Sequence, residues 1–284
     1  MVDRKFVFLQ KEKEKKRQGA NWKMLKENLL FGSVDKVQQA INRIKLHEPK
    51  EGYYVAFSGG KDSVVVLDLV RRAGVKYEAH HNLTGTEPPE LIYFIREHYS
   101  DIITESPKIT MWQLIVNNGV PPTRLMRYCC KELKEHGGEG RFKITGIRHE
   151  ESIKRSKRKY FEPCIHNTGT RFLNPIIDWS NEEVWEYIKK YNVPYCKLYD
   201  NGWKRIGCMF CPMSSRSEKA RQEVEYPKYK ALYIKTFNKM IEKRKTDGKK
   251  CNWQNGEECF NWWVDEKRNN YENQMDLFNP IDFV

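Results

Sequence analysis

The sequence predicts an α/β protein built on a doubly wound, mostly parallel sheet. Short β-rich apolar runs alternate with helical patterns between about residues 49 and 195, and the first run leads directly into a glycine-rich loop and a helix. Strands that alternate with helices in this way form parallel sheets with helices on both faces. The composition, 39% hydrophobic and 13% aromatic, supplies enough core-forming side chains to exclude a disordered basic chain.

Residues 1–48 are expected to form an N-terminal helical extension. A basic segment comes first, and an amphipathic helix follows in which Val37, Ile41 and Ile44 recur at helical spacing. Ser33 precedes this pattern and is the predicted N-cap, because its hydroxyl can accept a hydrogen bond from a first-turn N–H.

Residues 49–195 are expected to form the α/β domain itself. Its predicted strands are at residues 53–57, 76–83, 101–104 and 142–147. Two of its helices are expected to end at Gly74 and at about His98. A third is expected after Ser180, whose side chain can form a capping box with Glu183.

Residues 196–284 are expected to form a C-terminal region of different character. It contains a cysteine-bearing loop, a long helical stretch at residues 217–245 and an aromatic tail. The adjacent Trp262 and Trp263 are interpreted as residues that seal a core, with stacking on a ligand as the less favoured alternative.

The charge balance restricts the binding partners. Lys and Arg number 51 against 38 Asp and Glu, giving a formal net charge of +13. Such a surface prefers polyanions, namely nucleic acid, nucleotides or an anionic membrane. No apolar run reaches the roughly 18 residues of a membrane span, so no membrane association is expected. Eight cysteines without an export signal indicate a cytoplasmic location and metal or sulfur chemistry rather than disulfides.

The strongest single motif is a six-residue loop between the first strand and its helix. It reads Ser58, Gly59, Gly60, Lys61, Asp62, Ser63. Small residues let the backbone approach a polyanion, the helix N-terminus attracts negative charge, and the lysine adds a mobile cation. The longer Walker pattern is absent, so ordinary γ-phosphoryl transfer is not favoured.

This loop resembles the pyrophosphatase-type nucleotide loop of the adenine-nucleotide alpha hydrolase superfamily. Within it, the chain is similar to the phosphoadenosine phosphosulfate reductase family and the related enzymes of DNA phosphorothioation. The resemblance implies ATP and Mg²⁺ as cofactors, and nucleotide contacts from Thr84 and Gly85, which match the family's Thr-Gly element. Where the family often has Asp before Thr-Gly, this chain has Leu83, so Glu87 is either a substitute acid or a solvated turn residue.

The second motif is a pair of cysteine pairs. Cys129 and Cys130 are adjacent, and Cys208 and Cys211 form a C-x-x-C turn. Four thiolates brought together would hold an iron–sulfur cluster or Zn²⁺, and free redox-active thiols are the third alternative. The pattern resembles that of bacterial adenylylsulfate reductases, which implies a [4Fe–4S] cluster on these four residues.

Arg148 and Arg155 follow the predicted strand at residues 142–147, so they are expected at the carboxyl edge of the sheet, where ligands of open α/β folds bind. They are candidate anion contacts within a strip, residues 141–159, that has eight Lys or Arg and that can follow a phosphate backbone. Cys164 is either a catalytic, persulfide-carrying thiol or a buried small residue.

Three functions are compatible with these features. The favoured one is an ATP pyrophosphatase that adenylates DNA or tRNA, with Lys61, Asp62, Arg148 and Cys164 as catalytic candidates. Sulfur would then come from a cysteine desulfurase, and a homodimer is left open. The first alternative is a sulfonucleotide reductase, but this chain has Phe260 after Cys259 where the reductase tail has glycine. The second is a non-enzymatic nucleic-acid-binding module.

Overall fold

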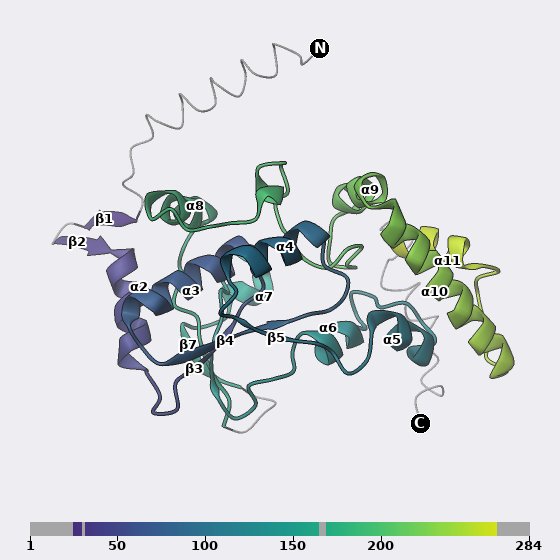
Figure 1. Cartoon of the computed structure of the whole chain (residues 1–284), viewed down its shortest axis with the longest axis horizontal. Coiled ribbons are helices and arrows are strands. Elements are labelled where there is room, and N and C mark those ends of the chain that lie inside the picture. Colours follow the sequence, from purple (N-terminus) through teal and green to yellow (C-terminus); the bar gives the residue numbers. More distant parts are fainter. Residues whose placement is uncertain (1–24, 30–31, 165–168, 266–284) are drawn as a thin grey trace, which may run out of the picture.

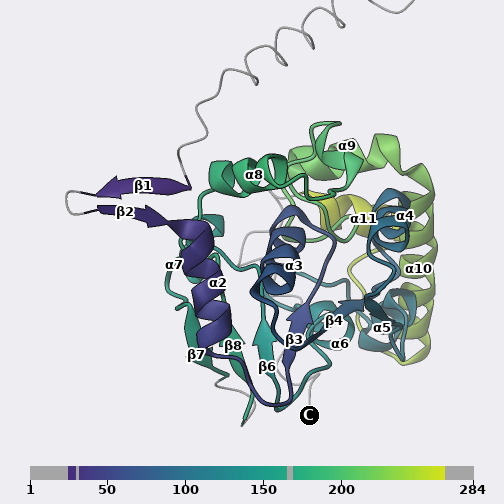
Figure 2. The same ribbon diagram turned by 60° about the vertical axis from the view of Figure 1, so that its left-hand side comes forward.

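A six-stranded sheet forms the centre of the molecule, in the order β5-β4-β3-β6-β8-β7 (Figures 1 and 2). The structure is a computed structural model that describes residues 25–29, 32–164 and 169–265. The strands are β3 (Tyr53–Ala56), β4 (Tyr77–Asn82), β5 (Ile103–Glu105), β6 (Phe142–Ile144), β7 (Phe161–Pro163) and β8 (Arg171–Leu173). All pairings are parallel except β7 with β8, which confirms the mostly parallel α/β sheet.

One face of the sheet is covered by helices that pack along α3 (Lys61–Ala73). They are α2 (Lys36–Leu46) and α8 (Asn181–Lys190), both of which contact α3. Figure 2 shows this layer above β3 and β6. The predicted capping box at the start of α8 is confirmed. The apolar side chains of α3 are buried here, which anchors the loop in front of it.

On the opposite face, a loop covers the centre of the sheet. The Tyr54 ring lies under Gly137 and Gly138, where added Cβ atoms would approach within 2.6 and 2.7 Å of it. Glycine is therefore needed at both positions for the loop to close onto the ring.

The N-terminal part differs from the prediction. β1 (Lys26–Leu29) and β2 (Gly32–Asp35) form an antiparallel hairpin, which the sequence patterns did not indicate. Ser33 lies inside β2, and the N-cap of α2 is Asp35, whose carboxylate accepts from the N–H groups of Val37 and Gln38. The prediction of Ser33 was wrong because the second strand extends the chain up to Asp35. The basic segment at residues 1–24 lies outside the described residues.

The C-terminal region forms a helical layer beyond the sheet (Figure 1). It contains α9 (Arg216–Glu225), α10 (Pro227–Thr246) and α11 (Gly256–Val264). The predicted single helix is divided, because Pro227 disfavours helical backbone at Tyr226 and opens a new helix. Against it pack α5 (Met111–Asn118) and, through α5, α6 (Tyr128–Leu133).

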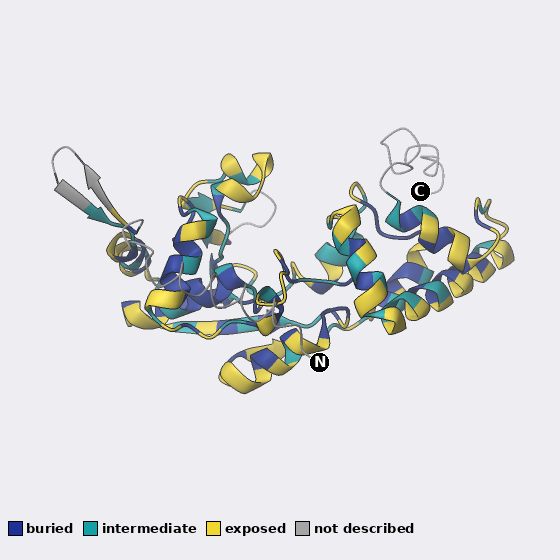
Figure 3. Ribbon diagram, turned by 90° about the horizontal axis from the view of Figure 1, so that it is seen from above, coloured by how far each residue is buried: buried dark blue, intermediate teal, exposed yellow. Residues whose placement is uncertain are grey.

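Burial follows this layering (Figure 3). Trp263 is 2% exposed and donates through its indole N–H to the Pro122 carbonyl oxygen at 2.6 Å. This confirms the core-sealing interpretation for Trp263. No helix in the described ranges is long and apolar enough to cross a membrane.

Candidate nucleotide and thiol site

The six-residue loop lies at the carboxyl end of β3 and at the N-terminus of α3, as predicted. Ser63 Oγ donates to the Gly60 carbonyl oxygen at 2.8 Å and accepts from the Ser58 N–H at 3.3 Å, which closes the loop on itself. In the described part of the chain, the N–H groups of Gly59 and Asp62 have no intramolecular acceptor. Unpaired N–H groups at a helix N-terminus form a binding site for anions.

The two glycines have different reasons to be glycine. Gly59 has φ +71°, and a Cβ there would lie 2.7 Å from Leu91 Cδ1 and 2.8 Å from Ile95 Cδ1. Gly60 has an ordinary φ of −75°, and its nearest neighbours would be Ser58 Oγ at 3.4 Å and the Tyr199 hydroxyl at 3.6 Å. The fold therefore requires Gly59, whereas Gly60 keeps the space above the helix N-terminus open.

Arg148 forms an ion pair with Asp62 of this loop, in which the arginine side chain is buried. It lies after β6, at the carboxyl edge of the sheet where it was predicted. Its Nε lies 2.6 Å from Asp62 Oδ1, and Lys61 Nζ lies 3.2 Å from Asp62 Oδ2. Burial lowers the pKa of Arg148, but the Asp62 carboxylate outweighs this and leaves the pKa raised. Gly146 makes the approach feasible, since a Cβ there would lie 3.0 Å from the Asp62 carbonyl carbon.

The Thr84–Glu87 turn follows the carboxyl end of β4, the strand next to β3 in the sheet. Glu87 is 5% exposed, and its carboxylate accepts from the Thr84 N–H at 3.0 Å and from the Thr84 hydroxyl at 2.6 Å. Glu87 is therefore not the solvated turn acid that was one alternative, and its oxygens are used inside the turn. Gly85, with φ +74°, permits this conformation.

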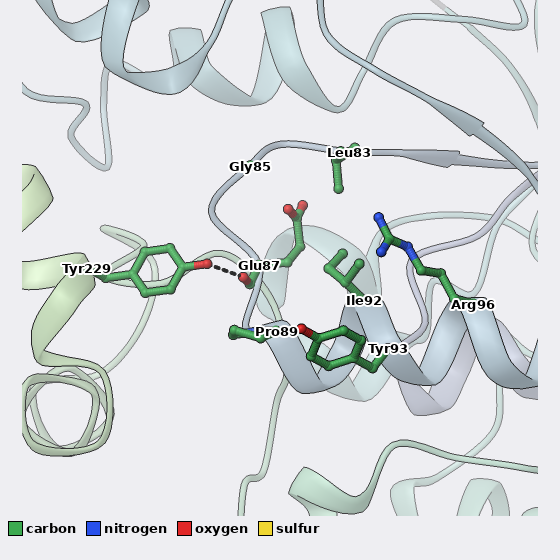
Figure 4. A pocket seen from close by; sticks show the side chains of 8 residues that line it. All are labelled: Leu83, Gly85, Glu87, Pro89, Ile92, Tyr93, Arg96 and Tyr229. Carbon is green, nitrogen blue, oxygen red and sulfur yellow. Dashed lines mark hydrogen bonds between the residues drawn. The ribbon is translucent and has the colours of Figure 1, made fainter.

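A small cavity of about 190 Å³ opens beside this turn (Figure 4). Its wall includes Gly85 and Glu87 from the turn, Arg96 from α4 (Pro89–His98) and Tyr229 from α10. The Tyr229 hydroxyl donates to the Glu87 carbonyl oxygen at 2.7 Å, which ties the C-terminal layer to the turn (Figure 4).

The structure brings the two cysteine pairs into one region. The pKa of Cys129 is raised, first by its hydrogen bond to Cys130 and by burial, and further by the charges of Cys208 and Cys211. Cys208 Sγ also lies 3.5 Å from Thr84 Oγ1, so the thiols adjoin the Thr84–Glu87 turn. In the described ranges, no three His, Cys, Asp or Glu side chains are arranged to hold a single metal ion.

Cations surround these thiols. The hydrogen bond from the Cys129 thiol, together with Arg127 Nη2 at 3.3 Å from Cys130 Sγ, lowers the pKa of Cys130 to about 5. The Cys208 thiolate raises the pKa of Lys134. Positive neighbours favour thiolates, which are the forms that bind metals.

Two candidates lie apart from this group. Cys164 follows β7, and its N–H donates to the Thr170 carbonyl oxygen just before β8, at the amino edge of the parallel strands. The structure therefore does not bring Cys164 to the phosphate loop, because β7 runs antiparallel and ends at the opposite edge. Arg155, in α7 (Ile153–Ser156), is ion-paired with Glu151 rather than pointing to the loop.

The basic strip is only partly available to a ligand. Arg141 and Arg158 are ion-paired with Glu78 and Glu162, and Lys143 Nζ donates to the Gly137 carbonyl oxygen at 2.6 Å. The cations of the strip that are exposed are Lys154, Lys157 and Lys159.

Sequence reasoning missed two residues of the site. Tyr199, in the short helix η2 (Lys197–Tyr199), accepts a hydrogen bond from the Lys61 N–H at 2.9 Å. No motif marks it. Lys134 follows Cys130 by four residues, about one helical turn. This spacing alone could have placed a cation near the cysteine pair.

Comparison with known proteins decides the family. The model of the phosphoadenosine phosphosulfate reductase domain matches residues 52–214, more than half of the chain. The chain belongs to this family. The matched segment of the phosphoadenosine phosphosulfate reductase domain contains the phosphate loop, the Thr84–Glu87 turn, Arg148 and all four clustered cysteines.

The relatives of this reductase-domain chain differ in length. An uncharacterised protein of Methanocaldococcus jannaschii is 31% identical over 69% of this chain and 44% of its own length, so the chain spans about half of such relatives. An adenosine 5′-phosphosulfate reductase of Oceanobacillus iheyensis is 30% identical over 55% of this chain and 69% of its own. A crystal structure of phosphoadenylyl-sulfate reductase from Candida auris is 18% identical, with a TM-score of 0.49, over 62% of this chain and 89% of its own.

Mutation can distinguish the roles of Gly59 and Gly60 in this reductase-family loop. Gly59→Ala should lower the free energy of unfolding by about 2 kcal/mol, because its φ is positive and the methyl group meets α4. Gly60→Ala should fold normally but weaken ATP binding about tenfold or more, because its methyl group takes up space for phosphate oxygens. Urea denaturation and ATP titration measure both; normal ATP binding by Gly60→Ala would contradict this reading of the loop.

The thiol pKa values predict selective alkylation of the metal-free, reduced protein. Because the pKa of Cys130 is lowered to about 5, its thiolate predominates above that pH and is lost as the pH falls through it. Iodoacetamide followed by mass spectrometry should therefore label Cys130 at pH 6, where an ordinary thiol with a pKa of about 8.5 is unreactive. Arg127→Gln should shift the labelling profile to higher pH. If labelling of Cys130 in the wild-type protein were half-maximal only near pH 8, the lowered pKa of Cys130 would be refuted.

Proposed function

We propose that this chain is an ATP pyrophosphatase that adenylates a nucleic acid, DNA or tRNA, and so prepares it for sulfur incorporation. The observation that carries the proposal is the phosphate loop, with its unpaired N–H groups and with Lys61 and Arg148 sharing the single carboxylate of Asp62. Cleavage between the α and β phosphates develops negative charge on the leaving pyrophosphate. Preorganised N–H groups and cations stabilise such charge.

The N-terminus of α3, Lys61 and Arg148 have different proposed roles, which follow from their positions. The loop and the N-terminus of α3 would bind phosphate oxygens through the unpaired N–H groups of Gly59 and Asp62. Lys61, held near Asp62 on a flexible stem, can reach toward a phosphate as the charge develops. Arg148 is buried and keeps Asp62 in place, so it acts by positioning the loop.

Mg²⁺ is expected to enter with the nucleotide. The carboxylates of Asp62 and Glu87, the acids of the loop and the turn, are already engaged with Arg148, Lys61 and Thr84. These acids provide no ready ligand for the ion, and phosphate oxygens commonly supply much of the Mg²⁺ coordination in nucleotide sites.

The four clustered cysteines are proposed to hold a [4Fe–4S] cluster. Four thiols from two segments, with Arg127 and Lys134 beside them, match the donor set and the charge that such a cluster needs. The cluster would supply electron or sulfur chemistry next to the nucleotide. All eight cysteines are unbridged, which suits a reducing cytoplasm and a cysteine desulfurase as sulfur donor.

Nucleic acid is the proposed substrate because of the net charge of +13 and the exposed Lys154, Lys157 and Lys159. Among the described residues these three lysines form no ion pair, unlike the neighbouring Arg155 and Arg158. Such lysines release counterions when they bind a phosphate backbone.

Sulfonucleotide reduction is the second candidate, favoured by the relatives named adenosine 5′-phosphosulfate reductase. Against it stands Cys259, in the segment that resembles the reductase tail. Cys259 has no exposed surface, lies in α11 and packs into the core. A thiol that must move into the site to attack a sulfate would have to leave that core.

Lys61→Ala should reduce pyrophosphate release by about a hundredfold or more, since it removes the cation that faces the leaving group. A coupled pyrophosphate assay with ATP and either DNA or tRNA measures this. Lys239→Ala, on the exposed side of α10, is the matched control and should behave as wild type. Sulfite formed from a sulfonucleotide and thioredoxin without ATP, and no pyrophosphate, would favour the reductase instead.

Cys208→Ser should abolish the brown colour of anaerobically purified protein and lower its iron and sulfide content, because it removes one of four proposed ligands. Cys251→Ser, whose thiol donates to the Trp253 carbonyl oxygen and is not a proposed ligand, should retain both. Iron-free wild-type protein with full activity would exclude the cluster, and bound zinc in its place would support the alternative metal.

A further inference from the structure

The hydroxyl of Tyr199 occupies the mouth of the phosphate loop. It accepts the Lys61 N–H at 2.9 Å from a position 138 residues further along the chain, and it would lie 3.6 Å from a Cβ at Gly60. The Lys61 N–H is one of the first-turn donors of α3 that would otherwise face an anion. The hydroxyl thus lies beside the place where the phosphates of a nucleotide are expected.

The hydrogen of this hydroxyl is unused. Among the hydrogen bonds of the described residues, Tyr199 accepts from Lys61 and donates to no acceptor. Burial raises the pKa of Tyr199, so the hydroxyl keeps its proton at neutral pH. A phenol that accepts one hydrogen bond is a better donor for the next, because hydrogen bonds in a chain polarise one another.

The ring is held in place by its neighbours. Trp185 of α8 packs edge-on against it, with ring centroids 5.2 Å apart, and Lys61 Nζ lies 6.0 Å from its centroid. The hydroxyl is therefore fixed before a ligand arrives, which reduces the entropy lost on binding.

We propose that Tyr199 binds the nucleotide directly, by donating its hydroxyl hydrogen to a phosphate oxygen in the loop. This inference rests on the proposed nucleotide site and adds a residue from the segment between α8 and the C-x-x-C turn. It makes Tyr199 a phosphate-binding residue: the Lys61 N–H donates to the phenol oxygen, and the phenol donates to the phosphate.

Tyr199→Phe removes only the hydroxyl and keeps the ring. The chain offers a matched control in Tyr195→Phe, because Tyr195 packs edge-on against the same Trp185 at 5.2 Å, while its hydroxyl donates to Asp200 Oδ1 at 3.0 Å. Calorimetric titration with ATP and with pyrophosphate, and NMR titration with adenosine, compare the two variants with wild type.

The expected result is about tenfold or greater weakening of both ATP and pyrophosphate binding in Tyr199→Phe, the usual effect of losing one hydrogen bond to a charged group. Adenosine binding should be unchanged, and Tyr195→Phe should match wild type for every ligand. Unchanged pyrophosphate binding by Tyr199→Phe overturns the inference, and so does an equal loss for adenosine, which would mean a structural role. Wild-type protein that binds neither ATP nor pyrophosphate would overturn the proposed function itself, a distinguishable result.

Discussion

The ion pair between Arg148 and Asp62 holds the site together. It links the start of α3 to the segment after β6, 86 residues later, and the Arg148 side chain is only 4% exposed. Losing one partner of a buried pair leaves an uncompensated charge, which costs far more than a surface ion pair does. The conformation of the loop, the direction of Lys61 and the approach of Gly146 all depend on this contact.

A second set of contacts joins the cysteine pair Cys208 and Cys211 to the Thr84–Glu87 turn. The Met209 N–H donates to the Thr86 carbonyl oxygen at 2.7 Å, so the C-x-x-C turn and the Thr84–Glu87 turn share a hydrogen bond. Phe210 has a positive φ of 56°, unfavourable for a bulky residue, and its N–H is held by Gln222 Oε1 at 2.6 Å. Strain of this kind persists where surrounding contacts dictate the backbone, and here it fixes the direction of the two cysteines.

The segment between α8 and the C-x-x-C turn therefore serves both halves of the site. Tyr199 contacts the phosphate loop, and Cys208 lies beside Thr84 a few residues later. Both contacts come from one stretch of the chain, residues 199–208, so this segment lies beside the phosphate loop and beside the Thr84–Glu87 turn. Cys259 is fully buried and belongs to the same hydrophobic core as Phe210 and Tyr233.

Local sequence was sufficient for several features whose hydrogen bonds span a few residues. Three such features were predicted correctly, because each depends on residues within about one helical turn of one another. They are the strand–loop–helix around Ser58–Ser63, the capping box of Ser180 and Glu183, and the end of α3 at Gly74. The residue types also indicated chemistry, since paired cysteines and a lysine beside glycines have few other uses. Family membership followed from the same short motifs.

Strand pairing and long-range packing decided the rest. The N-cap is Asp35 rather than Ser33 because a local hairpin forms ahead of α2, and Cys164 lies at the amino edge because β7 pairs antiparallel with β8. Arg141 pairs with Glu78, 63 residues away, and the Tyr199 hydroxyl accepts from the Lys61 N–H across 138 residues. Partners so distant are chosen by the free energy of burying whole elements against one another, which no window of neighbouring residues contains.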